Sequence, residues 1–201
     1  MRIGLFFGSF NPIHNGHLII ANYVVQFTGI EQVWFVISPQ NPFKQTRQLL
    51  SEHHRYAMVK LAIDRAENYR ACTIEFDMPK PSYTYRTLEA LVRKFAENEF
   101  SLLMGGDNLP KFGQWRQAQW IMENFPVLVY PRKGFEYVQL KPYFEQYQRL
   151  GAKDISFVRA PLIEISATFI RTHLQAGKDL RFFLHPRVYQ YIVQNRLYIS
   201  K

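Results

Sequence analysis

Short apolar runs alternate with longer segments of helical periodicity along the chain, and this alternation constrains the fold more than any other feature of the sequence. Apolar runs bounded by turn residues are typical of buried strands, and helical segments between them are typical of a parallel sheet with crossover helices. The sequence therefore predicts an α/β protein with a Rossmann-like open parallel sheet and helices on both faces. The expected strands are 2–7, 32–38, 71–76, 100–104, 126–130 and 155–158, and the expected helices are 17–28, 51–67, 84–97, 114–124, 142–149, 167–175 and 186–194.

The whole chain, 1–201, is expected to form a single domain, because no Ser/Gly-rich linker, shift in composition or repeat of fixed period divides it. Hydrophobic residues make up 47% of the sequence, which excludes an intrinsically disordered or fibrous protein. The C-terminal helices, in about 166–201, are expected to pack on this domain. The aromatic side chains of these helices are expected either to pack in the core or to form a contact between copies of the chain, so a homo-oligomer is one possibility. The aromatic residues are Phe182, Phe183, Tyr189, Tyr191 and Tyr198.

The formal net charge of +9 predicts that the protein attracts anions, and phosphorylated metabolites, nucleic acid and anionic lipid all fit this charge. The Lys and Arg residues are scattered without a long basic run, which argues against a nucleic-acid partner. No apolar run approaches the roughly 18 residues of a membrane span, and no signal-peptide pattern is present, so we expect a cytoplasmic protein with no membrane partner. The single cysteine, Cys72, excludes an internal disulfide and a cysteine metal site.

The segment GSFNPIHNGH, residues 8–17, lies between the first expected strand and the first expected helix. At this place in a parallel sheet, a helix N-terminus offers N–H groups and a positive dipole end to phosphate. Gly8 would allow close approach of the backbone to a ligand, and His14 and His17 can project from one face of the helix start. Two imidazoles there suit a phosphoryl group that gains charge. A metal site and a purely structural histidine pair are the alternatives.

A second candidate phosphate site is ISATFIR, residues 165–171. Ser166 is a good N-cap residue, and Thr168 and Arg171 are spaced to lie together on the helix that it starts. Hydroxyl, backbone N–H and guanidinium groups could then converge on a polyphosphate. An ordinary capping sequence followed by a surface arginine is the alternative.

Together the two segments resemble the nucleotidyltransferase superfamily, whose members pair an N-terminal HxGH or TxGH motif with a C-terminal ISSTxIR motif. Ala167 stands at a position of the second motif that commonly varies between Ser and Ala. Within that superfamily the chain resembles the bacterial nicotinate-nucleotide adenylyltransferase family, because further motifs match in order over nearly the whole chain. These are Pro39, Pro42 and Lys44 after the second strand, PSYTYRTL from Pro81 to Leu88, GGDNL from Gly105 to Leu109, Trp115, and HPRVYQYI from His185 to Ile192.

The resemblance implies that the phosphate of nicotinate mononucleotide attacks the α-phosphorus of ATP, giving nicotinate adenine dinucleotide and pyrophosphate in NAD biosynthesis. It implies catalytic roles in charge stabilisation and phosphate clamping for His14, His17, Lys44 and Arg171. The residues expected at the ATP phosphates are Gly8, Ser9, Phe10, Ser166, Thr168 and Arg171, and those expected at nicotinate mononucleotide are Tyr83, Thr84, Asp107 and Trp115. Mg²⁺ is expected as a companion of ATP, with no protein ligand assigned.

The chain departs from the family pattern at several positions. The family often has GGTFDPIH where this chain has FGSFNPIH, so Phe7 replaces a glycine, Ser9 a threonine and Asn11 an aspartate. Ser9 keeps the hydroxyl, and Asn11 removes a negative charge beside an anion site. The usual PPHK loop reads NPFK here, which leaves Lys44 without a neighbouring histidine.

Two other functions stay open on the sequence. One is an adenylyltransferase of the same superfamily that acts on nicotinamide mononucleotide or phosphopantetheine. The other is a nucleotide-binding or RNA-binding protein that uses the same fold without catalysis, since a fold does not by itself imply a function.

Overall fold

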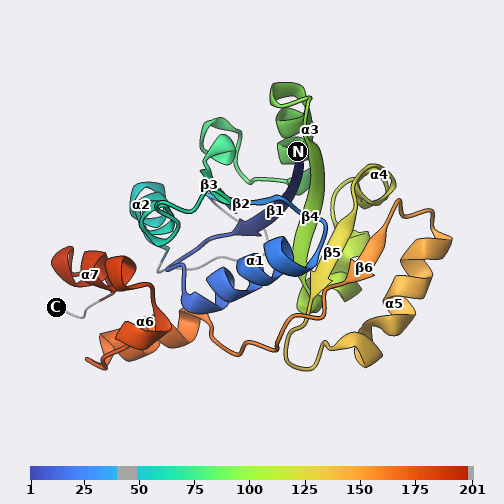
Figure 1. The fold of residues 1–201 in the computed structure, drawn as a ribbon. Coiled ribbons are helices and arrows are strands. Elements are labelled where there is room, and N and C mark those ends of the chain that lie inside the picture. The colour runs from blue at the N-terminus through green and yellow to red at the C-terminus, as the bar shows by residue number, and fades with distance from the viewer. Residues whose placement is uncertain (40–48, 199–201) are drawn as a thin grey trace.

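The computed structural model of the protein describes residues 1–39 and 49–198. Six strands form one sheet in which every pairing is parallel, in the order β3-β2-β1-β4-β5-β6 (Figure 1). The strands are β1 (Arg2–Gly8), β2 (Gln32–Ile37), β3 (Tyr69–Cys72), β4 (Glu99–Gly105), β5 (Val127–Tyr130) and β6 (Ile155–Phe157). This is the strand order of the Rossmann fold, so the predicted fold class is confirmed.

Helices cover both faces of the sheet. They are α1 (Asn15–Phe27), α2 (Glu52–Ala62), α3 (Thr84–Lys94), α4 (Ala118–Asn124), α5 (Tyr137–Arg149), α6 (Ala167–Gln175) and α7 (Pro186–Gln194), with the short 3₁₀ helices η1 (Ile74–Asp77), η2 (Gly106–Gln114) and η3 (Arg181–Phe183). The alternation of side chains along each strand separates two cores. On β1, Ile3 and Leu5 belong to the core under α3, α4 and α5, whereas Phe6 belongs to the core under α1, α2, α6 and α7.

The C-terminal helices lie on the α1 and α2 side of the molecule, and α7 packs against α2 (Figure 1). His54 of α2 and Tyr191 of α7 are joined by a hydrogen bond of 2.9 Å, and Arg187 forms an ion pair with Asp64. Of the C-terminal aromatic residues, Phe182 is 88% exposed, whereas Phe183, Tyr189, Tyr191 and Tyr198 pack against the core. Core packing therefore accounts for most of this aromatic group.

Several predicted boundaries were wrong. The helix expected over 51–67 ends at Ala62, because the chain turns through Arg65 in the left-handed region (φ 65°) to enter β3. The strand expected over 71–76 is shorter and begins earlier, since β3 pairs with β2 only from Tyr69 to Cys72 and then turns into η1. The helix expected over 114–124 begins at Ala118.

Two more boundaries also differ. The helix expected over 84–97 ends at Lys94, and the one expected over 142–149 begins at Tyr137 and contains Pro142. Within the described ranges, no helix is both long enough and apolar enough to cross a membrane.

Candidate active site

The candidate site lies at the carboxyl edge of the sheet, beyond β1 and β4. These two strands are neighbours at the centre of the sheet, where the strand order reverses direction. Open α/β sheets bind ligands in the crevice outside such a switch point. The predicted phosphate segment follows β1, and the GGDNL segment spans the end of β4 and the start of η2. Parallel pairing thus brings both segments to the same edge.

His14 and His17 lie together at the start of α1. His14 is the residue just before the helix and is 4% exposed, and the two rings stack with centroids 3.7 Å apart. Gly16 permits this packing, because a Cβ there would lie 3.0 Å from Nδ1 of His14 and 2.9 Å from Cγ2 of Ile163. The glycine of the motif therefore lets the His14 ring and the segment before α6 approach the helix start.

The contact between the two histidines sets the tautomer of His17. The backbone N–H of His14 donates a hydrogen bond of 3.2 Å to Nδ1 of His17. A ring nitrogen that accepts a hydrogen bond carries no proton, so the proton of this ring is at Nε2. His17 therefore presents Nε2–H as a hydrogen-bond donor, which is what an oxyanion requires.

His14 is neutral at physiological pH. Burial, together with the smaller effect of the positive charge of Arg132, lowers the pKa of His14 from 6.5 to about 3. Nδ1 of His14 is buried and has no hydrogen-bond partner among the described residues. His14 thus contributes a neutral ring, and among the described residues Arg132 and Arg171 bring positive charge to this region.

The loop after β1 has an unusual backbone. Phe10 is 2% exposed and has a φ of 45°, in the left-handed region that residues other than glycine seldom adopt. Its ring covers Gly8, where a Cβ would meet the ring at 2.8 Å, and packs edge-on against His17 at 5.2 Å. The ring of Phe10 thus occupies the space that a side chain at position 8 would take, so this space is not open to a ligand. Ser9 is partly buried and its carbonyl accepts a hydrogen bond from Arg55.

The second motif meets the first. Ser166 caps α6 by accepting a hydrogen bond of 3.1 Å from the N–H of Phe169. Arg171 is buried, and its Nη1 donates to the carbonyl oxygen of Asn11 over 2.8 Å while its Nη2 donates to Thr168 Oγ1 over 3.2 Å. Its Nε is buried without a partner among the described residues. The guanidinium therefore lies beside the loop that leads to His14.

Arg132 is a residue that the motifs do not reveal. It follows the carboxyl end of β5 and lines a small cavity with His14, His17, Tyr130 and Ile163. Its Nε lies 3.6 Å from Oδ1 of Asp107. The only available signal was its place shortly after a parallel strand, the edge where ligands of such sheets bind.

Of the residues expected at nicotinate mononucleotide, Tyr83 precedes α3 and Thr84 is its first residue, so the two residues form the start of the helix, as the sequence predicts. Trp115 follows η2 and packs edge-on against Phe112, with centroids 5.4 Å apart. The guanidinium of Arg116 lies 5.1 Å from the ring centroid of Tyr83, which brings the end of η2 next to the start of α3.

Lys44 lies outside the described residues, so its position relative to the histidines stays a prediction. Between residues 1 and 39 and between 49 and 198, no group of three or more His, Cys, Asp or Glu side chains could hold a metal ion. The described site instead carries arginine side chains and helix N-termini, which attract phosphate rather than a cation.

Residues 5–173 match the model of the family described as "Cytidylyltransferase-like". A protein of Bacteroides fragilis named "Probable nicotinate-nucleotide adenylyltransferase" is 43% identical over 195 residues, covering 96% of this chain and 92% of its own length. A protein of the same name from Flavobacterium johnsoniae is 43% identical over 200 residues, covering 98% of this chain and 99% of its own.

A solved structure titled "Plasmodium falciparum nicotinic acid mononucleotide adenylyltransferase complexed with NaAD" matches the fold with a TM-score of 0.76, 19% identity and coverage of 98% of this chain and 97% of that one. At that identity the likeness concerns the fold. The family model and the relatives of nearly equal length go further, and they show that this chain belongs to the cytidylyltransferase-like family and, within it, to the nicotinate-nucleotide adenylyltransferases.

Proposed function

We propose that this protein transfers the adenylyl group of ATP to the phosphate of nicotinate mononucleotide, releasing pyrophosphate and forming nicotinate adenine dinucleotide. The observation that carries the proposal is the hydrogen bond from Arg171 to the carbonyl of Asn11, which places the C-terminal phosphate motif beside the loop of the N-terminal one. The names of the full-length relatives agree with this activity.

In the proposed reaction, an oxygen of the acceptor phosphate forms a bond to the α-phosphorus of ATP. The bond from that phosphorus to the bridging oxygen breaks, and pyrophosphate leaves with the bonding electrons. Negative charge grows on the α-phosphate and on the bridging oxygen, so the protein's task is to align two anions and stabilise that charge. No covalent intermediate with the enzyme is needed.

The histidines would supply hydrogen bonds to the reacting phosphate. Nε2–H of His17 is set as a donor by the bond that its Nδ1 accepts, and it would bind an oxygen of the α-phosphate. The ring of His14, which stacks on that of His17 with centroids 3.7 Å apart, would lie beside the same phosphate. Because His14 is neutral with a pKa of about 3, its role is to donate or accept one hydrogen bond and not to supply a positive charge.

The positive charge would come from arginine. Arg171 and Thr168, which are joined by a hydrogen bond from Nη2 to Oγ1, would bind the β- and γ-phosphates at the N-terminus of α6 that Ser166 caps. Arg132 would bind phosphate from the side of β5, and Lys44 is proposed as a third cation. Backbone groups of Gly8, Ser9 and Phe10 would border the triphosphate.

The acceptor would lie on the α3 side of the site. The first N–H groups of α3, at Tyr83 and Thr84, would receive the nicotinate carboxylate, because a helix N-terminus favours an anion. Trp115 would stack on the pyridine ring, and Asp107, in the first turn of η2, would accept hydrogen bonds from ribose hydroxyls. Mg²⁺ would enter as part of the MgATP substrate and keep its phosphate and water ligands. Location in the cytoplasm stays a prediction.

A panel of acceptors tests the proposal. The purified protein is incubated with MgATP and, separately, with nicotinate mononucleotide, nicotinamide mononucleotide, phosphopantetheine and FMN, while pyrophosphate is measured. We expect the highest kcat/KM with nicotinate mononucleotide, because only that acceptor carries the ring carboxylate for the α3 N-terminus. A preference for phosphopantetheine would assign the chain to another activity of the superfamily, and ATP binding without pyrophosphate release would indicate a protein that binds nucleotide without catalysis.

A further inference from the structure

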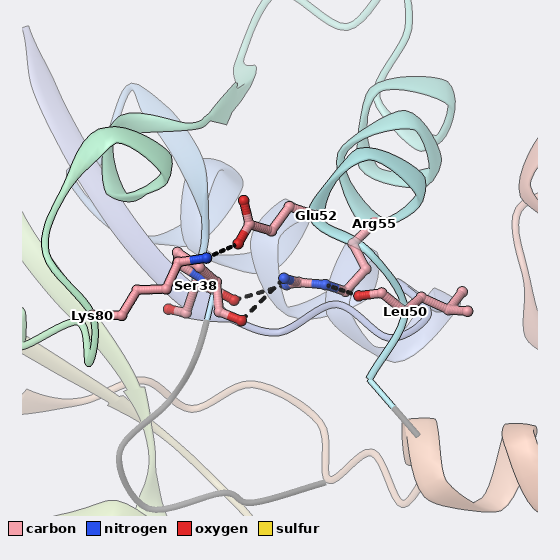
Figure 2. Close-up of polar contacts among 6 residues, drawn as sticks. Ser38, Leu50, Glu52, Arg55 and Lys80 are labelled. Carbon is pink, nitrogen blue, oxygen red and sulfur yellow. Dashed lines mark hydrogen bonds and ion pairs between the residues drawn. The ribbon is translucent and has the colours of Figure 1, made fainter. Parts of the chain in front are cut away.

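Arg55, in the first turns of α2, is completely buried. Its guanidinium donates to the carbonyl oxygens of Ser9 and Ser38, each over 2.8 Å. Its remaining hydrogen bonds reach the carbonyl oxygen of Leu50 over 3.0 Å and that of Pro39 over 3.3 Å. Figure 2 shows the guanidinium between the backbone of Ser38 and that of Leu50. One side chain thus joins the loop after β1, the end of β2 and the segment that begins α2.

The partners of Arg55 are backbone carbonyls, and no carboxylate forms an ion pair with it in the described part of the chain. The neighbouring Glu52 pairs with Lys80 instead, at 2.5 Å (Figure 2). Burial lowers the pKa of Arg55, an effect that Glu52 and Tyr198 oppose. Burial of a guanidinium costs free energy that its hydrogen bonds must offset, and all the described partners of Arg55 are backbone carbonyls of segments next to the phosphate loop. Arg55 therefore fixes the backbone of these segments relative to one another.

The contact with Ser9 acts on the backbone of the phosphate loop. The Ser9–Phe10 peptide is trans, so holding the carbonyl of Ser9 against Arg55 turns the N–H of Phe10 to the opposite side. Phe10 has a φ of 45°, a conformation that costs about 1–3 kcal/mol outside glycine and persists only where surrounding contacts impose it. Arg55 supplies such a contact directly before the strained residue, and Phe10 in turn packs on His17.

We propose that Arg55 is a positioning residue for adenylyl transfer, which holds the loop from Gly8 to His14 in the conformation that presents its N–H groups and both histidines to the triphosphate. Arg55 acts through the carbonyl of Ser9 and does not touch substrate. The inference rests on the proposed function, because it names the site that the loop serves.

Arg55→Met and Arg55→Lys test this role. Met keeps the apolar stem and removes all the hydrogen bonds, whereas Lys keeps the charge and part of the donors. We expect kcat with MgATP and nicotinate mononucleotide to fall by about 10²-fold in Arg55→Met, the loss typical of a small misplacement of reacting groups. Arg55→Lys should show an intermediate loss. The KM for nicotinate mononucleotide should change little, because the acceptor residues are on α3 and η2.

The control separates positioning from stability. Ile121→Ala removes a buried side chain of α4 on the opposite face of the sheet and should lower the free energy of unfolding by about 2–5 kcal/mol. All variants are assayed well below their melting temperatures, where Ile121→Ala should keep the wild-type kcat. If Arg55→Met also keeps it, the positioning role is wrong. If Arg55→Met does not fold, the kcat of Arg55→Lys is compared with that of the wild type and of Ile121→Ala instead, and a wild-type kcat in Arg55→Lys would show that the positioning role is wrong.

Hydrogen exchange of the loop provides a readout that does not depend on turnover. Backbone amides of residues 8–14 should exchange faster in Arg55→Lys or Arg55→Met than in the wild type and in Ile121→Ala. Equal exchange rates in this segment would overturn the proposal. If the wild type released no pyrophosphate with any acceptor, the proposed function would fail, while the exchange comparison would still show whether Arg55 holds the loop.

Discussion

Arg171 donates a hydrogen bond of 2.8 Å to the carbonyl oxygen of Asn11, although 160 positions of chain separate the two residues. The bond joins α6 to the loop after β1. It gives a hydrogen-bond partner to the buried guanidinium of Arg171, which takes part in none of the ion pairs found among the described residues. Asn11 also accepts, through Oδ1, a hydrogen bond of 2.6 Å from the hydroxyl of Tyr198, near the end of the chain. The loop is thus held from two C-terminal segments.

Arg171→Met should lower both stability and activity. The variant keeps the apolar stem but loses the charged hydrogen bond to Asn11, so the free energy of unfolding should fall by about 1.5–3 kcal/mol in urea titrations. Pyrophosphate release should fall further than stability explains, because the phosphate clamp is also lost. Arg149→Met, on the exposed surface of α5, is the control. Unchanged unfolding would mean that the contact with Asn11 contributes nothing in solution.

His17→Ala should reduce kcat by about 10²–10³-fold, the loss typical of removing one donor to a developing oxyanion. The melting temperature should change little, because His17 is only partly buried. His53→Ala, an exposed histidine of α2, should leave turnover at the wild-type level. Near-normal kcat in His17→Ala would remove His17 from the mechanism.

His14 should make the protein less stable as the pH falls. The pKa of His14 is about 3 in the folded protein, and we take 6.5 for the unfolded chain. At pH values between 3 and 6.5 the unfolded chain therefore binds a proton at His14 that the folded protein does not. The free energy of unfolding should therefore decrease by up to about 1.4 kcal/mol for each pH unit below 6.5 from this group alone. Urea titrations of the wild type and His14→Gln from pH 7 to pH 4 measure the difference. Parallel curves for the two proteins would contradict the prediction.

Arg132→Gln should raise the KM for ATP by about tenfold, equivalent to about 1.4 kcal/mol of binding free energy, with a smaller effect on the KM for nicotinate mononucleotide. The reason is that the guanidinium lines the cavity that contains both histidines. Arg65→Gln, whose side chain is 88% exposed, provides a matched loss of charge far from this cavity. Equal KM values for ATP in both variants would show that Arg132 is not a phosphate ligand.

Glu75→Gln should stabilise the protein at high pH. Glu75 is 1% exposed, burial raises the pKa of its carboxyl group, and Oε1 accepts a hydrogen bond of 2.8 Å from Thr87. The folded state thus favours the neutral carboxyl, and this contribution to stability is lost as the pH rises through the raised pKa. The melting temperature of Glu75→Gln should exceed that of the wild type at pH 8, by about 2–4 °C for each 1 kcal/mol, and approach it at pH 4. A lower melting temperature at pH 8 would show that the ionised carboxylate is stabilised by other groups.

The pattern of apolar runs was enough to predict the order of strands and helices, because buried parallel strands and amphipathic helices have different periods. The phosphate motifs could be found as well, since a capping serine and closely spaced polar residues at a helix start have local signatures. Boundaries were less accurate where tertiary contacts decide them. β3 stops at Cys72, which pairs with Val36, because the chain then turns into η1, and the sequence around Glu75 contains no signal for that turn.

The α/β class, the two phosphate motifs and the family could all be inferred before the structure was known, because they depend on local periodicity and on short runs of residues. The burial of Arg55 and Arg171, the position of Arg132 beside the histidines and the packing of Phe10 on Gly8 became visible in the folded protein alone. The sequence around an arginine on a helix does not indicate which groups its side chain will contact. Its burial depends on backbone carbonyls that come from other segments, and those meet only when the sheet has formed.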